Sequence, residues 1–551
     1  MKKIIFILGL AAVVLGISCS DVLDLNPADR FSPATVWSTT TTADKYVIGL
    51  YSIFGANTEM RGGDAYASPR LSDAYSDILK STSWNQYNHN FNATLLQETA
   101  FNSNSAGAFE CWSSHYDRIR RENEFLRDAA EFGSKFGEDW LKIRIAEVRF
   151  CRAYAYFMLC RVYGGVILRT EVDGPEQNDK ARSTEEECWG FIINELKELA
   201  PDLPLKWDSD NSGRATQKAA YGLLSRVALY AEKWDVAAQA ARDCATAEGN
   251  LDLSKNGYAK IFELGINSPE VLFAVEFKSS VIDHAYDAYV RPSGDTKELG
   301  KQVYSGFVPT SELVDSYEMA GDGGNFSWEK HGKDPYANRE PRFYATILYN
   351  GADWMGRKIE SFVGGKDGYK AYENAGAAGT TVTGYYLRKY LIDGDKTWVT
   401  SGSGQDWIVL RYAEVLLNKA EALAMENWNK NSAEALQALN DVRARVGLPA
   451  RATADKETFL EYVRHERKVE LAGEGFRYWD LRRWRLAEKV IDGQNVHGVK
   501  ISKQSDGSFT YEQVDADGGH KRIFYDRYYR FAIPLSERSN NSLCTNNDGW
   551  I

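Results

Sequence analysis

The fold is decided by the stretch TQKAAYGLLSRVALYAEKWDVAAQAARDCAT, residues 216–246. Apolar residues recur there every three or four positions in two segments, 216–231 and 234–246, separated by a short Glu232-Lys233 turn. This spacing predicts two amphipathic helices joined by a tight turn. Large, small and aromatic residues stand where two antiparallel helices must interlock: Tyr221, Leu224, Ser225, Ala228, Trp234, Ala237, Ala241 and Cys244. The pattern is typical of a tetratricopeptide helical hairpin.

Similar helical hairpins are predicted on both sides of this stretch. Since a single hairpin cannot bury its apolar face alone, we expect the hairpins to stack into an array. Ser183 and Glu186 fit a capping box at the start of one helix. The predicted pairs are 43–54 with 109–132, 143–163 with 184–199, 411–425 with 432–446, and 458–472 with 475–487.

Two regions break the helical pattern. Residues 57–107 are rich in Gly, Ser, Asn and Asp, and residues 251–407 contain several glycine clusters. About 150 residues cannot form one structureless connection inside a compact protein. We therefore predict a mainly α fold, in which an array of tetratricopeptide-like hairpins carries an irregular, loop-rich subdomain with short strands. Binding residues are often found in loops that a rigid scaffold positions.

The N-terminus has the features of an export signal. Lys2 and Lys3 precede an apolar run of about 14 residues, Ile4–Ile17, which is too short to cross a bilayer alone. Cys19 follows the small residue Ser18 and resembles the bacterial lipobox cysteine, which becomes the lipidated N-terminus. This resemblance implies a membrane anchor at Cys19. The alternative is an ordinary secreted protein with a chance cysteine.

These observations divide the chain into segments of different expected roles. Residues 1–18 are the signal peptide, 19–56 the lipid-anchored segment and first helix, and 57–108 a loop insertion. Residues 109–250 and 408–490 are tetratricopeptide-like helices, 251–407 the irregular ligand-binding subdomain, and 491–551 the C-terminal segment.

Composition argues against several functions. The 551 residues include 66 Lys and Arg against 77 Asp and Glu, and the basic residues form no long run, so we expect no nucleic-acid partner. The seven histidines are scattered and the seven cysteines lack metal-ligand spacing. We expect no metal and no cofactor, and we expect the helical cysteines to be small buried residues.

Two charged regions resemble functional sites only superficially. Glu466, Glu470, Glu474 and Asp480 could supply paired carboxylates for acid–base catalysis. Because acidic and basic residues alternate along one helix face, we predict instead an ion-pair network that fixes helix packing. The acidic run 506–517 lacks the twelve-residue pattern of a calcium loop, and we predict a solvated loop.

Aromatic residues provide the candidate ligand contacts. Phe, Trp and Tyr make up 13% of the chain, and several lie in glycine-rich loops. The face of a Trp or Tyr ring complements the C–H face of a pyranose, while nearby amides and guanidinium groups can hold its hydroxyls. For each residue the alternative is packing within the protein. The candidates are Trp84, Asn85, Tyr87, Tyr286, Tyr289, Arg291, Tyr304, Trp354 and Trp398.

Several phrases of the sequence resemble the SusD/RagB family. They are NREPRFYATI at 338–347, PTSELVD at 309–315, LRYAEVLLNKAEA at 410–422, the charged segment 466–484, and NNDGW at 546–550. They occur in the family's order over essentially the whole mature chain. The segment around Trp84 matches a stretch that carries an aromatic pair in the family's founding starch binder. Tyr286 to Tyr304 precede the 309–315 phrase, where the family also presents ligand contacts.

The resemblance implies a non-catalytic surface lipoprotein of the Bacteroidetes outer membrane. Such a protein captures oligosaccharides, or less often peptides, and sits as a lid on a SusC-like TonB-dependent transporter. Two alternatives remain at this point: the same partnership with peptide cargo, and a tetratricopeptide interaction adaptor without a small ligand. The adaptor would carry its exposed aromatic residues in the groove of the helical array.

Overall fold

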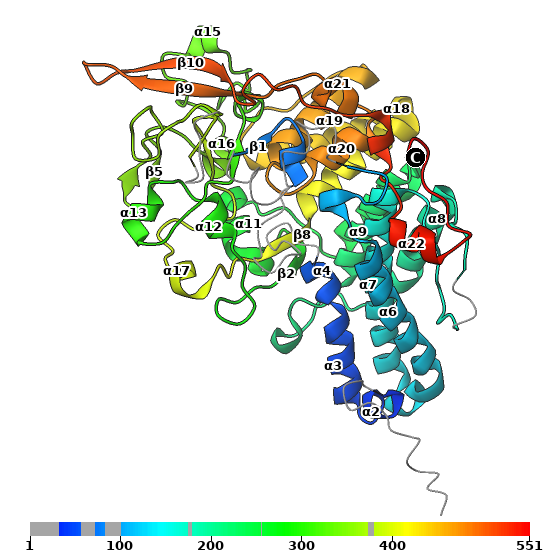
Figure 1. Cartoon of the computed structure of the whole chain (residues 1–551). Coiled ribbons are helices and arrows are strands. Elements are labelled where there is room, and N and C mark those ends of the chain that lie inside the picture. Colours follow the sequence, from blue (N-terminus) through cyan, green and yellow to red (C-terminus); the bar gives the residue numbers. More distant parts are fainter. Residues whose placement is uncertain are drawn as a thin grey trace, which may run out of the picture.

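The structure is a computed structural model that describes residues 32–56, 72–82, 101–174, 179–254, 256–372 and 380–550. Over these residues the protein is mainly helical, with small two-stranded sheets, which confirms the predicted fold class. In Figure 1 the long helices lie together on one side of the molecule, and the short elements of the loop-rich region lie on the other.

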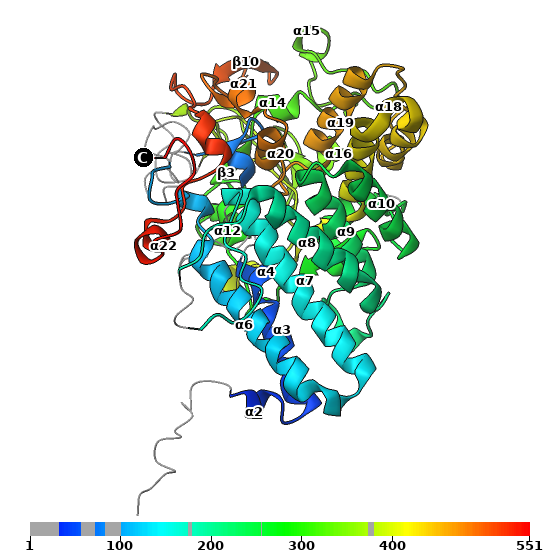
Figure 2. The ribbon, with the colours of Figure 1, turned by 90° about the vertical axis from the view of Figure 1, so that its right-hand side faces the viewer.

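The helical array is a series of helices that pack in chain order. Contacts run from α6 to α7, α8, α9, α10, α18 and α19 in turn, and Figure 2 shows α6 to α10 side by side. The bounds are α2 Pro33–Val36, α3 Thr40–Leu50, α4 Ser52–Ala56, α6 Trp112–Phe132, α7 Glu138–Tyr163, α8 Glu185–Leu199, α9 Gln217–Tyr230, α10 Trp234–Thr246, α18 Tyr412–Arg445, α19 Lys456–Glu470, α20 Arg477–Arg483 and α21 Ala487–Ile491.

The predicted helices are present, but not every predicted pairing is. α9 packs on α10 and α7 on α8 as predicted, whereas α6 packs mainly on α7 rather than on α3, and α19 packs mainly on α18. α10 has the predicted bounds, and α9 differs by one residue at each end. The predicted pair 411–425 and 432–446 forms α18, whose helical path is interrupted at Asn427 (φ −164°, ψ 93°). The predicted helix 475–487 is divided into α20 and α21, and Arg485 between them has a φ of 54°.

The capping box of α8 lies one residue later than predicted. Thr184, not Ser183, is the N-cap, and its side chain accepts a hydrogen bond from the backbone N–H of Glu187 at 3.2 Å. The Glu187 carboxylate accepts in return from the backbone N–H of Thr184 at 2.8 Å. The register follows from the backbone, because Thr184 is still extended (φ −61°, ψ 158°) and the helix begins at Glu185.

Short helices and strands make up most of the remaining structure. The α-helices are α11 Gly257–Leu264, α12 Tyr286–Val290, α13 Asp295–Leu299, α14 Ser311–Val314, α15 Trp328–His331, α16 Pro341–Thr346, α17 Trp398–Ser401 and α22 Leu535–Asn540. The strands form antiparallel pairs: β1 Leu79–Ser81 with β3 Phe307–Pro309, β2 Val271–Val275 with β8 Trp407–Arg411, β4 Ile347–Leu348 with β7 Tyr386–Leu387, β5 Asp353–Trp354 with β6 Arg357–Lys358, and β9 His497–Lys503 with β10 Phe509–Asp515.

The β2–β8 ribbon joins the loop-rich region to the array. Val271 pairs with Arg411 and Val275 with Trp407, so the chain enters and leaves this region at the same ribbon. β8 then runs directly into α18 at Tyr412. The two ends of the loop-rich region are therefore held next to each other by the β2–β8 ribbon.

The C-terminal acidic run differs from its prediction. Residues 509–515 form β10, which projects with β9 from the edge of the molecule (Figure 1). Asp506 lies in the exposed turn, but Asp517 is fully buried and forms ion pairs with Lys80 at 2.8 Å and Arg522 at 2.9 Å. The prediction of a solvated loop is wrong for this end of the run, because Asp517 neutralises two buried cations.

A buried ion-pair network surrounds Glu470 at the end of α19. Its carboxylate contacts Arg342 of α16 at 2.9 Å and Arg411 of β8 at 2.7 Å, and it also contacts Arg445 at the end of α18. Burial alone would raise the pKa of Glu470, but the three arginines hold it well below its ordinary value. The carboxylate therefore stays ionised and ties the loop-rich region to the array.

Neighbouring pairs extend this network, and every charged side chain in it is at most 1% exposed. Glu466 pairs with Arg342 and Arg443, Glu474 with Arg411 and Lys389, Glu270 with Arg411 and Arg445, and Glu318 with Arg443.

The network confirms the structural interpretation of the charged segment 464–485. Glu466, Glu470, Glu474 and Asp480 are all buried and ion-paired. More of the pairs join residues from separate elements than neighbours on one helix face. For example, Arg467 of α19 contacts Asp480 of α20 at 2.8 Å. No pair of these carboxylates is left open to a substrate.

The helical cysteines Cys151, Cys160, Cys188 and Cys244 are buried, as predicted. Cys111, Cys151, Cys160, Cys188, Cys244 and Cys544 are buried free thiols. Within the described ranges, no helix combines the length and apolar character needed to cross a membrane.

We expect the substitution Glu470→Gln to lower the free energy of unfolding by about 3–5 kcal/mol at pH 7, because it leaves buried arginines without their shared anion. A depressed pKa adds stability above the ordinary pKa of 4.5 that is lost as pH falls below it, so the difference from wild type should shrink in acid. Urea unfolding at several pH values measures this. The control Glu512→Gln removes an exposed partner of Lys500 and should change little. Equal effects of the two substitutions would contradict the role of the network.

Candidate ligand-binding site

The sequence candidates fall into three groups in the structure. Trp84, Asn85 and Tyr87 lie outside the described residues, as does Cys19. Tyr289 and Tyr304 lie beside the β1–β3 ribbon, whereas Tyr286 and the remaining candidates are in the protein interior. The structure therefore describes six of the nine candidate ligand contacts: Tyr286, Tyr289, Arg291, Tyr304, Trp354 and Trp398.

A tyrosine pair marks the end of the β1–β3 ribbon. The rings of Tyr289 and Tyr304 have centroids 4.9 Å apart at an interplanar angle of 41°. Backbone hydrogen bonds fix this position: the N–H of Gly306 donates to the carbonyl of Tyr289 at 2.6 Å, and the N–H of Tyr304 donates to that of Ala288 at 2.8 Å. Tyr304 is half-buried, and Tyr289 is 7% exposed.

The chain leaves β1 beside this pair. The N–H of Thr82 donates to the carbonyl of Gly306 at 3.0 Å, and Thr82 is the last described residue before the segment that contains Trp84. Trp84 follows Thr82 by two residues in the sequence. The segment that contains Trp84 therefore begins at the ribbon end that carries the tyrosine pair. The two groups of candidates are about 200 residues apart in the sequence.

Tyr286 lies on the same short helix as Tyr289, α12, but faces the interior. Its ring is fully buried, and its hydroxyl donates to the carbonyl of Lys389 at 3.0 Å. Lys389 belongs to the ion-pair network through Glu474. Tyr286 therefore packs the ribbon end against the network.

Arg291, Trp354 and Trp398 form a buried cluster. The Arg291 guanidinium lies 5.2 Å from the centroid of each tryptophan ring. Trp354 donates its indole N–H to Asp295 at 3.0 Å, and Arg291 donates to Asp287 at 2.8 Å. The two rings are 0% and 1% exposed, so neither offers an accessible face to a ligand in this structure. Because both rings are buried, we assign Trp354 and Trp398 a packing role.

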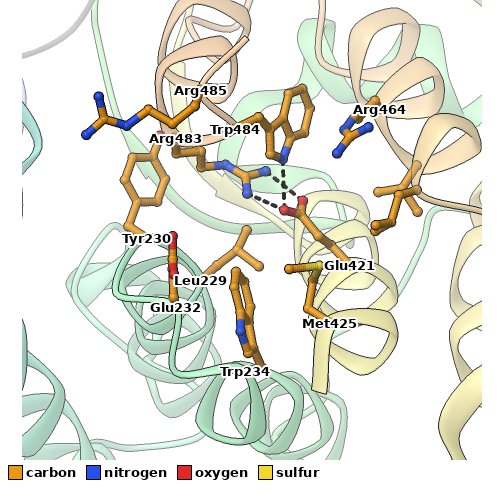
Figure 3. A pocket seen from close by; sticks show the side chains of 12 residues that line it. Leu229, Tyr230, Glu232, Trp234, Glu421, Met425, Arg464, Arg483, Trp484 and Arg485 are labelled. Carbon is orange, nitrogen blue, oxygen red and sulfur yellow. Dashed lines mark hydrogen bonds and ion pairs between the residues drawn. The ribbon is translucent and has the colours of Figure 1, made fainter. Parts of the chain in front are cut away.

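Sequence reasoning did not select a cavity of about 230 Å³ within the helical array. It is lined by Tyr230, Trp234 and Trp484, all half-buried. Figure 3 shows the Glu421 carboxylate pointing toward Arg483 and Trp484. Glu421 accepts hydrogen bonds from the Arg483 guanidinium at 2.5 and 2.7 Å and from the Trp484 indole at 2.8 Å. In the sequence, Trp234 belongs to the hairpin pattern of residues 216–246, and Trp484 ends the charged segment 466–484.

A wider depression of about 840 Å³ was also missed by the sequence. It lies between α3, α4, α6, the loop 210–214 and β2, and its lining includes Ile48, Phe54, Phe273 and Arg214. The volume is in the range of small-molecule sites. Because its residues come from segments far apart in the chain, no local pattern could have predicted it.

The fold and the site define a helical-repeat protein that carries a loop-rich subdomain. The SusD family model matches residues 269–550, and a model described as "Starch-binding associating with outer membrane" matches residues 21–229. The first match alone spans more than half of the chain, and the chain belongs to the SusD family. Proteins of this family are non-catalytic glycan-binding proteins.

Named relatives agree with this assignment over nearly the whole chain. A SusD-like protein of Bacteroides ovatus is 25% identical over 548 residues, covering 94% of this chain and 90% of the relative. SusD-like protein P38 of Formosa agariphila is 26% identical over 517 residues, covering 89% of this chain and 94% of the relative.

Solved structures share the fold. A SusD-like protein from Bacteroides fragilis superposes with a TM-score of 0.80 at 27% identity, covering 94% of this chain and 98% of the other. A SusD-like carbohydrate binding protein from the same species has a TM-score of 0.75 at 24% identity, covering 92% and 99%. Surface glycan-binding protein A from Bacteroides thetaiotaomicron, solved with laminarihexaose, has a TM-score of 0.66 at 18% identity, covering 92% and 98%.

We expect Trp398→Ala to lower the free energy of unfolding by about 3–5 kcal/mol, because it empties a fully buried site beside Arg291. Chemical denaturation followed by circular dichroism measures this loss. The control Trp234→Ala removes a half-buried ring and should cost clearly less. If Trp398→Ala left stability unchanged, the ring would not be the packing residue described above.

Proposed function

We propose that this protein is a surface lipoprotein that binds oligosaccharides by aromatic stacking and delivers them to a SusC-like TonB-dependent transporter. The observation that carries the proposal is the half-buried ring of Tyr304, which packs on the buried Tyr289 at the end of the β1–β3 ribbon, where Thr82 precedes Trp84 by two residues. Aromatic faces can bury the apolar C–H surface of a sugar ring without requiring a particular hydroxyl pattern.

The residues around the pair suit a neutral, polar ligand. Nearby charged groups are already compensated: Lys80 pairs with Asp517, and Arg291 pairs with Asp287. The names of the structural neighbours, one a carbohydrate binding protein and one a complex with laminarihexaose, favour oligosaccharides over peptides as the first probes.

The anchor and the location form a separate part of the proposal. Cys19 follows the apolar signal, and the model that matches residues 21–229 is described as associating with the outer membrane. A lipid on Cys19 would hold the protein at that surface, since each buried methylene contributes roughly 0.8 kcal/mol. Delivery to a transporter then requires no membrane-spanning segment of this chain.

A second candidate function is that of an interaction adaptor. The half-buried rings of Tyr230, Trp234 and Trp484 line a cavity in the helical array (Figure 3), which is where an adaptor would carry its aromatic residues. Trp, Tyr and Arg are also enriched at protein interfaces. This candidate predicts that the cavity, and not the ribbon end, controls binding.

We expect Trp84→Ala and Tyr304→Ala each to weaken oligosaccharide binding about tenfold, which corresponds to about 1.4 kcal/mol and lies within the range for stacking on one aromatic ring. A glycan array of the chain lacking residues 1–18 identifies the ligand, and calorimetry measures the affinities. Circular dichroism should show an unchanged fold.

The matched control for this experiment is Trp484→Ala, which removes a half-buried ring from the cavity of the helical array. It should leave oligosaccharide affinity unchanged. Loss of binding with Trp484→Ala alone would favour the helical array as the binding surface. Release of new reducing ends from the oligosaccharide would contradict a non-catalytic role.

We expect Cys19→Ala to leave oligosaccharide binding in solution unchanged but to reduce uptake of the same sugar by cells. The substitution removes the lipid attachment point and no described residue of the site. Membrane fractionation and growth on the sugar as sole carbon source measure the effect. Full membrane retention of the variant would show that Cys19 is not the anchor.

A further inference from the structure

A second cavity in the helical array has five arginines among its eleven lining residues. It has a volume of about 120 Å³ and lies where α7, α8, the α9–α10 turn and α20 meet Arg530. We call it the basic pocket. Its charged lining residues are Arg161, Arg482, Arg483, Arg485 and Arg530, with Glu185 and Glu232.

Some of these arginines already have carboxylate partners. Arg483 pairs with Glu421 at 2.5 Å and Asp480 at 2.8 Å, and Arg530 pairs with Glu185 at 2.5 Å. These carboxylates compensate the arginines that they contact. Arg485 has an exposed partner in Asp526 at 3.7 Å, which leaves Arg161 and Arg482 as the lining arginines without an ion pair among the described residues.

Arg482 is buried, and no described carboxylate forms an ion pair with it. Its side chain is 4% exposed, and its Nη2 donates to the carbonyl of Tyr529 at 2.7 Å. Its Nε and Nη1 have no hydrogen-bond acceptor among the described residues. The guanidinium lies 4.7 Å from the centroid of the Trp479 ring and 4.6 Å from that of Phe531. Aromatic contacts of this kind compensate a buried cation only in part.

Arg161 brings a second uncompensated cation to the same ring. Its guanidinium lies 4.1 Å from the Trp479 centroid, and its Nη2 contacts the sulfur of Met158 at 3.2 Å. Over the described ranges it forms no ion pair with a carboxylate, and its Nε has no hydrogen-bond partner. Two guanidinium groups thus approach one indole ring from α7 and α20.

The pKa of Arg482 is consistent with an excess of positive charge in the basic pocket. Burial lowers the pKa of Arg482 to about 10, and repulsion from Arg530 and Arg161 acts in the same direction. A bound anion would counteract both the burial and the repulsion, because its negative charge and its hydrogen-bond acceptors stabilise the protonated guanidinium group. Both arginines line the cavity, so an anion that entered it would lie beside their guanidinium groups.

We propose that the basic pocket binds one oxyanion group, a carboxylate or a sulfate, which accepts hydrogen bonds from Arg482 and Arg161. Guanidinium groups present planar pairs of N–H donors that match the oxygens of such anions. The volume exceeds the roughly 10–15 Å³ that a single water needs. This site is separate from the Tyr289–Tyr304 pair and does not rest on the function proposed above.

The oxyanion has two chemical sources, a free small anion or the acid group of a sugar. The basic pocket shares Tyr230, Glu232, Arg483 and Arg485 with the aromatic cavity of Figure 3. A sugar whose acid group lay in the basic pocket would therefore have the rings of that cavity beside it. A free anion would use the basic pocket alone.

The test is calorimetric titration of the chain lacking residues 1–18 with sodium sulfate, sodium acetate, methyl β-glucuronide and the neutral methyl β-glucoside, at constant ionic strength. We expect saturable binding of the anionic probes and none of the glucoside. Tighter binding of the glucuronide than of acetate would assign the site to an acidic sugar. Equal binding would assign it to a free anion.

The variant Arg161→Gln tests the site itself. Because Arg161 is half-buried, the substitution should be tolerated, and it should weaken anion binding about tenfold. Arg482→Lys keeps the charge but removes the planar donor pair, and it should also weaken binding. The control Arg120→Gln removes the same charge from the exposed face of α6, where Arg120 pairs with Glu124, and should have no effect. Absence of saturable anion binding, or equal effects of Arg161→Gln and Arg120→Gln, would overturn the proposal.

Discussion

The buried carboxylate of Glu470 is the constraint on which the rest of the structure depends. Arginines from α16, from β8 and from the end of α18 meet at this one group on α19. A charge removed from water is tolerated only when a partner compensates it, so none of these elements can be buried without the others. The network therefore specifies how the loop-rich region docks on the helical array. Arg411 has a central place, because it ends β8, precedes α18 and also contacts Glu270 beside β2.

The same network explains why the most charged part of the sequence is not a reactive site. The arginines and glutamates that characterise the family phrases are engaged with one another: Arg342 lies in the 338–347 phrase, Arg411 in the 410–422 phrase and Glu470 in the charged segment. They hold the scaffold together, and none of these carboxylates is left open to a substrate. In the basic pocket, by contrast, no carboxylate of the described residues pairs with Arg161 or Arg482.

Sequence reasoning succeeded where local spacing carries the information. The helices from α7 to α10 followed from apolar periodicity, and the buried cysteines followed from their positions on those helices. It failed by one residue at the α8 cap, because both Ser183 and Thr184 can act as caps and only the backbone decides which is extended. It also grouped Tyr304 with Trp354 and Trp398, although Tyr304 is half-buried and the two tryptophans lie in the interior. Loop composition does not distinguish these environments.

The sequence by itself determined the class of fold, the family and the division between helical and loop-rich regions, because helix periodicity and short motifs are properties of neighbouring residues. Only the tertiary structure decided which aromatic rings have accessible faces and which charges lack partners. Trp354 is buried because its indole reaches Asp295, which is 59 residues away, and Arg482 is unpaired because no described acidic side chain from another element reaches its Nε and Nη1. Burial and charge compensation arise from contacts between distant segments, and such contacts exist only once the chain has folded.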